Sequence, residues 1–336
     1  MVDELSAPAS RWSRRALLIH SARVTIGVLL LAFLILRTDV DSLVLALATC
    51  RWELVLLSTA LFFGNQFIVT WRWRAILGDR GGPSVPFLLL FHWGMIGCFV
   101  NMFMPSVVGG DVMRIYRLSR FTGSPCGALS TVIMERGIGL LCLVAISVVT
   151  FPFFTPARMD AQIYIGVAVV SGFFTCAVLL SASEAVRRGT VGLLRHVGIA
   201  DRWSERFDAV VASYHALIHD RRAVVITCML TLVTQVVFVI LSWLLGEALG
   251  LGVPLAYYFI AIPMILLLTT LPVSVHGVGI RESAFVFFFA PVGVSVESAI
   301  VMSLLRFSQM MMLGVFGGLF FLCDPIATRV ISHKPA

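Results

Sequence analysis

The sequence predicts an all-α polytopic membrane protein, and three observations support this fold class. Hydrophobic residues make up 59% of the 336-residue chain and charged residues only 13%, whereas soluble domains average about 45 to 50% and about 25%. Continuous apolar stretches such as Val24 to Leu36 and Val224 to Leu245 suit helical spans, which need about 20 such residues. These stretches lack the alternation that the strands of a membrane β-barrel require. The chain has room for about six to nine spans and almost none for a soluble domain.

Six segments are predicted to cross the membrane. They are Ser21 to Leu36, Leu54 to Val69, Cys126 to Phe154, Ala161 to Leu180, Val224 to Ala248 and Ser298 to Leu322. No small-residue cleavage pattern follows the first span, so it is expected to be retained rather than removed as a signal peptide. Two other apolar segments, Val85 to Met104 and Leu255 to Leu271, run into Pro105 and Pro272 and are expected to be helices broken at membrane depth. The alternative is that Val85 to Met104 simply crosses the membrane, since 20 residues are enough to span it.

The two broken segments share a motif. PSVVGGDVMR (Pro105 to Arg114) and PVSVHGVGIR (Pro272 to Arg281) each carry two glycines and an arginine nine positions after the proline. Similar elements in the same order indicate an internal repeat. The predicted halves are residues 21–160 and 161–323, each with two spans, a re-entrant or broken helix hairpin and one further span.

Charge bias predicts how the halves are oriented. If the first hairpin enters from the cytoplasm and the second from outside, 17 basic residues lie on the cytoplasmic side and three, Arg37, Arg51 and Arg158, lie opposite. Cytoplasmic loops gather Lys and Arg, so the sequence predicts two inverted-topology repeats, which is a transporter architecture. Residues 1–20 and 324–336 are then cytoplasmic tails, and the polar stretch 184–222 is an amphipathic cytoplasmic segment at the interface.

Composition also limits the partners. The net charge is +7, and every basic residue except Lys334 is arginine, whose planar fork suits phosphate and whose charge suits an anionic membrane surface. The arginines are spread over many short loops, so nucleic acid is not an expected partner. The seven cysteines form no CxxC pair, and neither a zinc signature, a P-loop nor a nucleophile elbow is present. We therefore expect no metal, no cofactor, no use of ATP and no enzymatic activity.

The strongest functional signal is a set of four arginines at membrane depth: Arg114, Arg136, Arg281 and Arg306. A charge there costs at least about 2.5 to 3.5 kcal/mol, so something must compensate it. Adjacent residues on a helix point about 100° apart, so Glu135 is not expected to pair with Arg136. Asp111, Glu282 or a ligand remain as partners, and we predict that the four arginines share a polar cavity between the halves.

Glycines begin the half-helices that follow both breaks. Flexible backbone there would direct free N–H groups and the positive end of a helix dipole into the protein, next to the arginines. A lipid phosphate is the expected ligand. The competing explanation is that the glycines only permit close helix packing while the arginines reach out to headgroups. The remaining predicted binding residues are Gly109, Gly110, Gly277, Gly279, Asn101 and His276, of which the histidine could couple transport to protons.

Two weaker features lie elsewhere in the spans. Trp71 and Trp73 alternate with Arg72 and Arg74, which predicts an interfacial belt. Gln235 lies within an apolar span, where it would either bond between helices or line a pathway.

Four motifs together resemble the flippase-like transmembrane region of the lysylphosphatidylglycerol synthase family. They are WRWRAIL (Trp71 to Leu77), GGDVMRIYRL (Gly109 to Leu118), MERGIGLL (Met134 to Leu141) and PVSVHGVGIRE (Pro272 to Glu282). The resemblance implies movement of a lipid with a large or charged headgroup across the bacterial inner membrane. In bifunctional members an attached synthase domain makes the lipid. Only 13 residues follow Cys323, so we expect that domain to be absent here. Stand-alone members are associated with hopanoid lipids or polyprenyl-phosphate-linked sugars, so the resemblance does not name the substrate.

Three functions remain open from the sequence. The first is a lipid flippase or transporter whose arginines, held by Asp111, Glu135 and Glu282, bind an anionic headgroup. The second is an integral membrane enzyme that transfers a group to or from a lipid phosphate, with Glu135, Asp111 or His276 as general base. The third is a non-transporting subunit of a lipid-synthesising complex, docked through residues 184–222 onto the lipid-synthesising enzyme.

Overall fold

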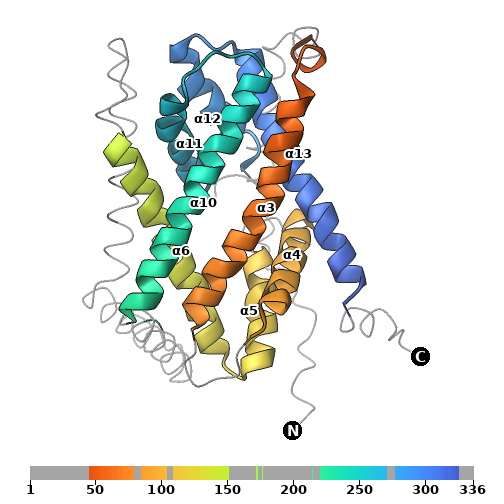
Figure 1. Ribbon diagram of the computed structural model, residues 1–336, viewed down its shortest axis with the longest axis vertical. Helices are drawn as coiled ribbons and strands as arrows, with labels where there is room; N and C mark the ends of the chain where they lie inside the picture. Colours follow the sequence, from red (N-terminus) through yellow and green to blue (C-terminus); the bar gives the residue numbers. More distant parts are fainter. Residues whose placement is uncertain are drawn as a thin grey trace, which may run out of the picture.

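The described part of the protein is helical throughout. In the computed structural model it comprises residues 45–78, 85–103, 109–150, 220–270 and 277–324, with Gly172, Cys176 and Tyr214, and these residues contain no strand. Four described helices are long and apolar enough to cross a membrane: α3 (Trp52–Leu77), α6 (Pro125–Thr150), α10 (Arg221–Ala248) and α13 (Val296–Leu322) (Figure 1). They confirm four predicted spans. The other two, Ser21 to Leu36 and Ala161 to Leu180, lie outside the described residues apart from Gly172 and Cys176, which are helical.

The two segments predicted to break are short helices followed by a second helix. α4 (Phe87–Phe103) has 17 residues and α11 (Leu255–Thr270) has 16, which makes them about 25 Å long against a hydrocarbon core of about 30 Å. They lead to α5 (Gly109–Thr122) and α12 (Ile280–Phe289). Whether each pair forms a broken or re-entrant hairpin stays a prediction. The predicted break points at Pro105 and Pro272 lie outside the described residues.

Side-chain caps define the ends of the long helices. The Asp220 carboxylate accepts a hydrogen bond from the Ala223 N–H at the start of α10, and the Ser295 hydroxyl accepts one from the Ser298 N–H at the start of α13. Between α12 and α13 the short 3-10 helix η4 (Ala290–Val292) ends at Gly293, whose φ of 85° favours glycine. These caps therefore fix the first turn of α10 and of α13.

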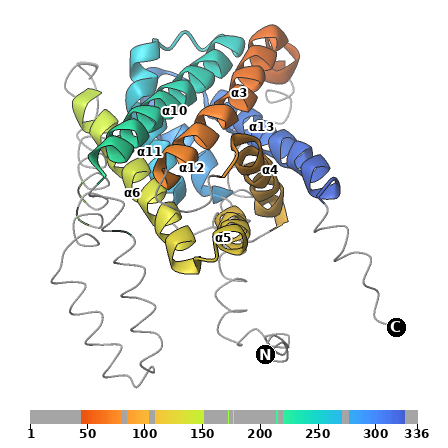
Figure 2. The same ribbon diagram turned by 60° about the horizontal axis from the view of Figure 1, so that its bottom comes forward.

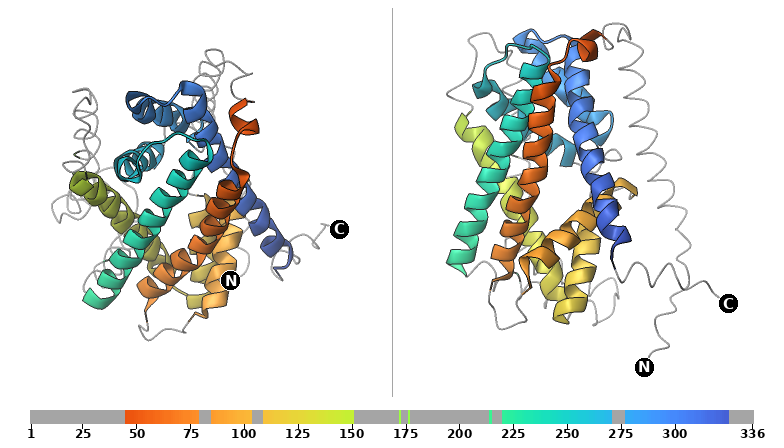
Figure 3. Two further views of the ribbon diagram at one scale, coloured as in Figure 1. Left: turned by 45° about the horizontal axis from the view of Figure 1, so that its top comes forward. Right: turned by 45° about the vertical axis from the view of Figure 1, so that its right-hand side comes forward.

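The helices form one bundle with a hairpin at each end. α3 and α10 run side by side in opposite directions, with α4–α5 at one end and α11–α12 at the other (Figures 1 and 3). Figure 2 shows α5 between α4 and α6. Each hairpin also packs on the long helix of the other half, α4 on α13 and α11 on α6. Two halves with the same arrangement of helices would pack on each other in this way. The inverted orientation of one half relative to the other stays a prediction.

Apolar side chains both fill the bundle and cover it. The largest buried cluster lies around α11 and α12, where Tyr258 and Phe289 are fully buried. Large apolar residues such as Leu56, Val233 and Leu319 are exposed on the outer faces of the long helices. A lipid-facing surface needs such residues, because no water is present there to reward polar ones.

Candidate functional site

The first polar group forms where α5 begins against the middle of α6. The Asp111 carboxylate, in the first turn of α5, accepts hydrogen bonds from Arg136 Nη2 at 2.6 Å and Nε at 2.9 Å. Gly110 permits α5 to approach α4 closely, because a Cβ at this position would lie 2.5 Å from the Gly97 carbonyl oxygen of α4. The Gly110 N–H donates to Asn101 Oδ1 at 2.6 Å. The α4–α5 packing thus sets the position of Asp111.

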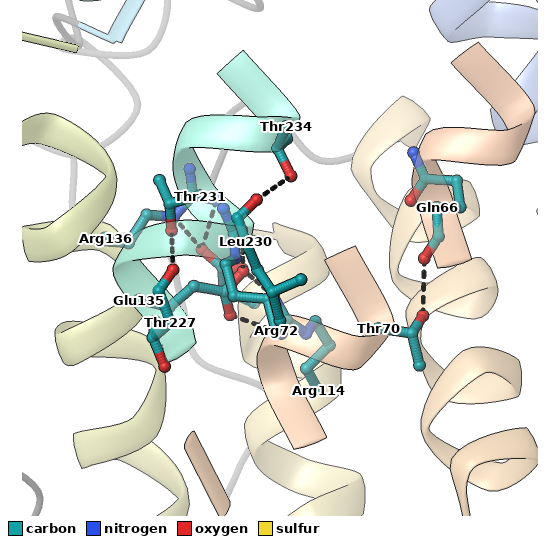
Figure 4. A network of polar contacts seen from close by, with 11 residues as sticks. Gln66, Thr70, Arg72, Arg114, Glu135, Arg136, Thr227, Leu230, Thr231 and Thr234 are labelled. Carbon is teal, nitrogen blue, oxygen red and sulfur yellow. Dashed lines mark hydrogen bonds and ion pairs between the residues drawn. The ribbon is translucent and has the colours of Figure 1, made fainter. Parts of the chain in front are cut away.

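Glu135 is the second carboxylate of this group and binds two arginines. It is buried, and it pairs through Oε1 with Arg72 of α3 and through Oε2 with Arg114 Nη2 at 2.6 Å (Figure 4). The Arg114 guanidinium also lies 4.1 Å from the ring centre of Trp73, a favourable position over an aromatic face. We call Arg72, Asp111, Arg114, Glu135 and Arg136 the first arginine group.

A second polar group forms where α12 begins against α13. The Glu282 carboxylate accepts from Arg281 Nη2 at 2.6 Å, from the Ser303 hydroxyl at 3.0 Å and from the Gly279 N–H at 2.6 Å. Gly277 and Gly279 have φ values of 71° and 82°, a conformation that favours glycine, at the turn into α12. Arg281 also lies 4.6 Å from the ring centre of Phe307.

Arg306 completes this group without an acidic partner among the described residues. Its Nη1 donates to Gln309 Oε1 at 2.7 Å, and its guanidinium lies 5.0 Å and 5.2 Å from the ring centres of Phe62 and Phe238. Gln309 in turn donates to the Ser58 hydroxyl of α3 at 2.9 Å. We call Arg281, Glu282, Ser303, Arg306 and Gln309 the second arginine group.

Each group holds more positive than negative charge. The first has three arginines against two carboxylates, and the second has two arginines against one carboxylate. Within the described residues, one positive charge in each group is therefore left without an acid to balance it. An unbalanced charge in a bundle of this kind is expensive unless something neutralises it. Both groups are suited to an anion.

The structure selects among the partners that the sequence left open. Asp111 is the partner of Arg136, while Glu135 pairs with Arg114 instead of its neighbour on the helix. Arg281 pairs with the adjacent Glu282 at 2.6 Å, in the first turn of α12, so neighbours on a helix do pair here. The binding role of these residues stays a prediction.

The contacts place the four predicted arginines in two groups rather than around one set of partners. In the second group, Arg306 contacts Phe62 on α3. The first group includes Arg72 of the same helix, which lies ten residues and about 15 Å further along. Arg136 is also the exposed member, with 51% of its side chain accessible. The two groups therefore lie at different depths of the bundle.

Two of the predicted free N–H groups of the glycines, those of Gly110 and Gly279, already donate to side chains. Asn101 accepts from Gly110 and Glu282 accepts from Gly279. Gly109 is buried at the start of α5, and Gly110 packs on Gly97, as the close-packing explanation requires. The arginine side chains, rather than these two N–H groups, are the donors left for an anion.

The predicted interfacial belt is wrong for two of its four residues. Trp73 is only 1% exposed and lies under Arg114, and Arg72 is turned inward to Glu135. Trp71 and Arg74 are exposed and contact each other, as a belt requires. Alternation along the sequence could not separate these pairs, because on a helix the side chains of adjacent residues point in different directions.

A third charged cluster was not predicted. Arg117 Nη2 pairs with Asp324 Oδ2 at 2.9 Å, and His92 Nε2 lies 3.3 Å from the same oxygen. Asp324, predicted to begin the cytoplasmic tail, is buried, and it connects the end of α13 to the α4–α5 hairpin. Ser303 and Gln309 were also missed, since small or amide side chains in a span give no signal of their own.

Some predicted residues and sites fall outside what the structure describes. His276 and the amphipathic segment 184–222 are among them, apart from Tyr214 and the residues from Asp220 onward. Within the described segments, no cluster of three or more His, Cys, Asp or Glu side chains could hold a metal ion.

Comparison with known proteins identifies the family. A UPF0104 membrane protein of Methanothermobacter thermautotrophicus is 23% identical over 317 residues, which covers 87% of this chain and 92% of the relative. No solved structure matches the chain significantly. Residues 21–318, nearly the whole chain and both arginine groups, match the family described as lysylphosphatidylglycerol synthase TM region. The chain therefore belongs to the lysylphosphatidylglycerol synthase TM region family, whose membrane domain is associated with lipid flippase and synthase function.

Proposed function

We propose that this protein is a lipid transporter that moves a lipid with an anionic or large headgroup across the membrane. The observation that carries the proposal is the single unbalanced positive charge in each arginine group. A phosphate-bearing headgroup supplies the missing negative charge and matches the planar donor fork of arginine. The acyl or isoprenoid chains remain in the bilayer, where the exposed apolar faces of the long helices meet them.

The position of Arg306 supports a ligand rather than a purely structural role. Its only described partners are one amide oxygen and two aromatic rings, and these leave its charge uncompensated. A guanidinium over aromatic faces keeps donors free for a bidentate contact with phosphate. Arg281, by contrast, is paired with Glu282 and serves to hold the start of α12 in place.

The enzyme alternative receives less support from the site. Asp111 and Glu135, its predicted general bases, each accept hydrogen bonds from two arginines. The carboxylates fit a role in positioning arginines better than a role in proton transfer.

The cellular setting follows from the same proposal. We propose a bacterial inner membrane as the protein's location, with both termini on the cytoplasmic side, as charge bias predicts. A lipid-synthesising enzyme that supplies the substrate is then the natural partner.

A vesicle assay with Arg306→Gln tests the proposal. Purified protein is placed in vesicles of phosphatidylcholine containing a little fluorescent NBD-phosphatidylglycerol, and dithionite reports how fast the label moves between leaflets. We expect wild-type protein to move it faster than empty vesicles do, and Arg306→Gln to be at least about tenfold slower. No acid loses its partner in this variant, so it should fold normally.

The matched control is Arg74→Gln, which removes an exposed arginine from α3 that contacts only Trp71 among the described residues. This variant should move the label at the wild-type rate. The proposal fails if wild-type protein moves no more label than empty vesicles, or if Arg306→Gln and wild type are equally fast. Mass spectrometry of the lipids that remain on each purified protein then names the substrate class.

A further inference from the structure

The long contact between α3 and α10 has a constant register. The Arg51 N–H donates to the Ala248 carbonyl at 2.9 Å, and the Ser58 hydroxyl donates to the Leu241 carbonyl at 3.0 Å. Both pairs of residue numbers add to 299, as they do when two antiparallel helices keep one alignment. Near the other end of the contact, Ile76 and Val224 pack in one cluster, and their residue numbers add to nearly the same value. The helices therefore lie along each other over their whole length (Figures 1 and 3).

This register places polar residues opposite one another in one half of the contact. Asn65 and Arg72 lie seven residues apart on one face of α3, and the alignment sets them against Thr234 and Thr227 of α10. Beyond Phe62 and Phe238, toward the other end, the facing residues are mainly apolar, with Val55, Leu241 and Leu245 buried there. We call the stretch from Asn65 to Arg72 and from Thr227 to Gln235 the polar seam.

Several buried atoms of the polar seam have no hydrogen-bond partner among the residues that the structure describes. These are both amide atoms of Asn65, the Thr227 hydroxyl, the Gln235 carbonyl oxygen and Nε of Arg72. Asn65 is 1% exposed and Thr227 is fully buried. Thr231 and Thr234, by contrast, donate to carbonyls of their own helix (Figure 4). Buried polar atoms are nearly always paired, so a row of unpaired ones indicates a missing polar ligand.

An unbalanced positive charge stands at each end of the polar seam. At one end, Arg306 lies over the facing rings of Phe62 and Phe238, whose centres are 6.1 Å apart. At the other end, Arg72 belongs to the first arginine group, which holds one arginine in excess. Donors and acceptors without partners therefore line the space between two excess charges, a combination that suits an anion carrying further hydroxyl or amide groups.

We propose that the polar seam is a second binding site for the lipid headgroup, through which it passes from one arginine group to the other. This inference rests on the proposed function and adds a route to it. α3 and α10 occupy equivalent places in the two predicted halves, so a small separation of the halves opens the seam. The headgroup then forms the hydrogen bonds that Asn65 and Thr227 lack. Its negative charge is held by the excess arginine of one arginine group or of the other.

The test is the double variant Asn65→Leu with Thr227→Val, which removes three of the five unpartnered atoms and keeps the branching of both side chains. In phosphatidylcholine vesicles, we expect it to move NBD-phosphatidylglycerol at least about tenfold slower than wild type. In detergent without added phosphatidylglycerol, we expect it to melt at a higher temperature than wild type, because unpaired buried polar atoms have been removed.

The matched control is Ser147→Ala, which removes a buried hydroxyl of α6 that is already bonded to the Leu143 carbonyl. It should move the label at the wild-type rate. The inference is overturned if the double variant transports at the wild-type rate, or if it melts at or below the wild-type temperature, as it would if water already satisfied the seam. Failure of the proposed function looks different, because wild type itself would then move no label.

Discussion

Charge balance in the first arginine group leads to the most discriminating prediction. Arg114→Met leaves Arg72 on Glu135 and Arg136 on Asp111, so two arginines face two carboxylates and the excess positive charge is gone. The variant loses the charge-assisted hydrogen bonds of Arg114, at 2.6 Å to Glu135 and at 3.4 Å to Asp111, and the stacking of Arg114 on Trp73. These contacts are worth about 1.5 to 3 and about 0.5 to 2 kcal/mol.

We therefore expect Arg114→Met to unfold about 2 to 5 kcal/mol more easily. Because no carboxylate is left unpaired, the protein should still be recovered folded. Movement of NBD-phosphatidylglycerol should fall about 10- to 100-fold, the equivalent of one charge-assisted contact to phosphate. Adding Glu135→Gln to this variant removes one negative charge, so the group again has one positive charge in excess, on Arg72. Arg72 can still donate to the amide oxygen of the new glutamine. Transport in this double variant should recover about tenfold or more, even though its stability does not.

The measurements are vesicle transport and thermal unfolding in detergent, with Arg120→Gln as control. Arg120 is an exposed arginine on the same helix as Arg114 and contacts only Tyr116 among the described residues. The charge-balance reasoning is refuted if a folded double variant transports no faster than Arg114→Met. That result would mean that the shape of Arg114, rather than the excess charge, binds the headgroup.

Two further predictions concern how the site is held. Arg281→Met should cost about 3 to 5 kcal/mol of stability, because it leaves Glu282, which is 1% exposed, as a buried charge without a counter-ion. Adding Glu282→Gln should recover most of this loss in thermal melts. No recovery would contradict the ion pair. Gly110→Ala should cost about 1 to 3 kcal/mol of stability, because the added methyl group pushes α5 away from Gly97. Gly137→Ala should not destabilise the protein, because the space around Gly137 is open. Equal melting temperatures for the two variants would argue against the close contact.

The arginines illustrate how far a single sequence reaches. Hydropathy located α3, α6, α10 and α13, because a lipid-embedded helix must be apolar over about 20 residues whatever its neighbours are. The same cost of burying charge drew attention to Arg114, Arg136, Arg281 and Arg306. Hydropathy also found the short α4 and α11 ahead of their prolines, although not whether such a helix crosses the membrane.

Only the tertiary structure decided which side chains meet. Gln309 binds Ser58, 251 positions away, and Arg72 turns inward to Glu135 although its neighbours Trp71 and Arg74 face out. Such contacts depend on the rotation and register of helices packed against each other, which local composition does not encode. The polar seam along α3 and α10 arises in the same way. The sequence alone thus determined a helical membrane protein with charged residues at depth, and the packing of distant helices divided those charges into two groups and aligned unpaired polar atoms between them.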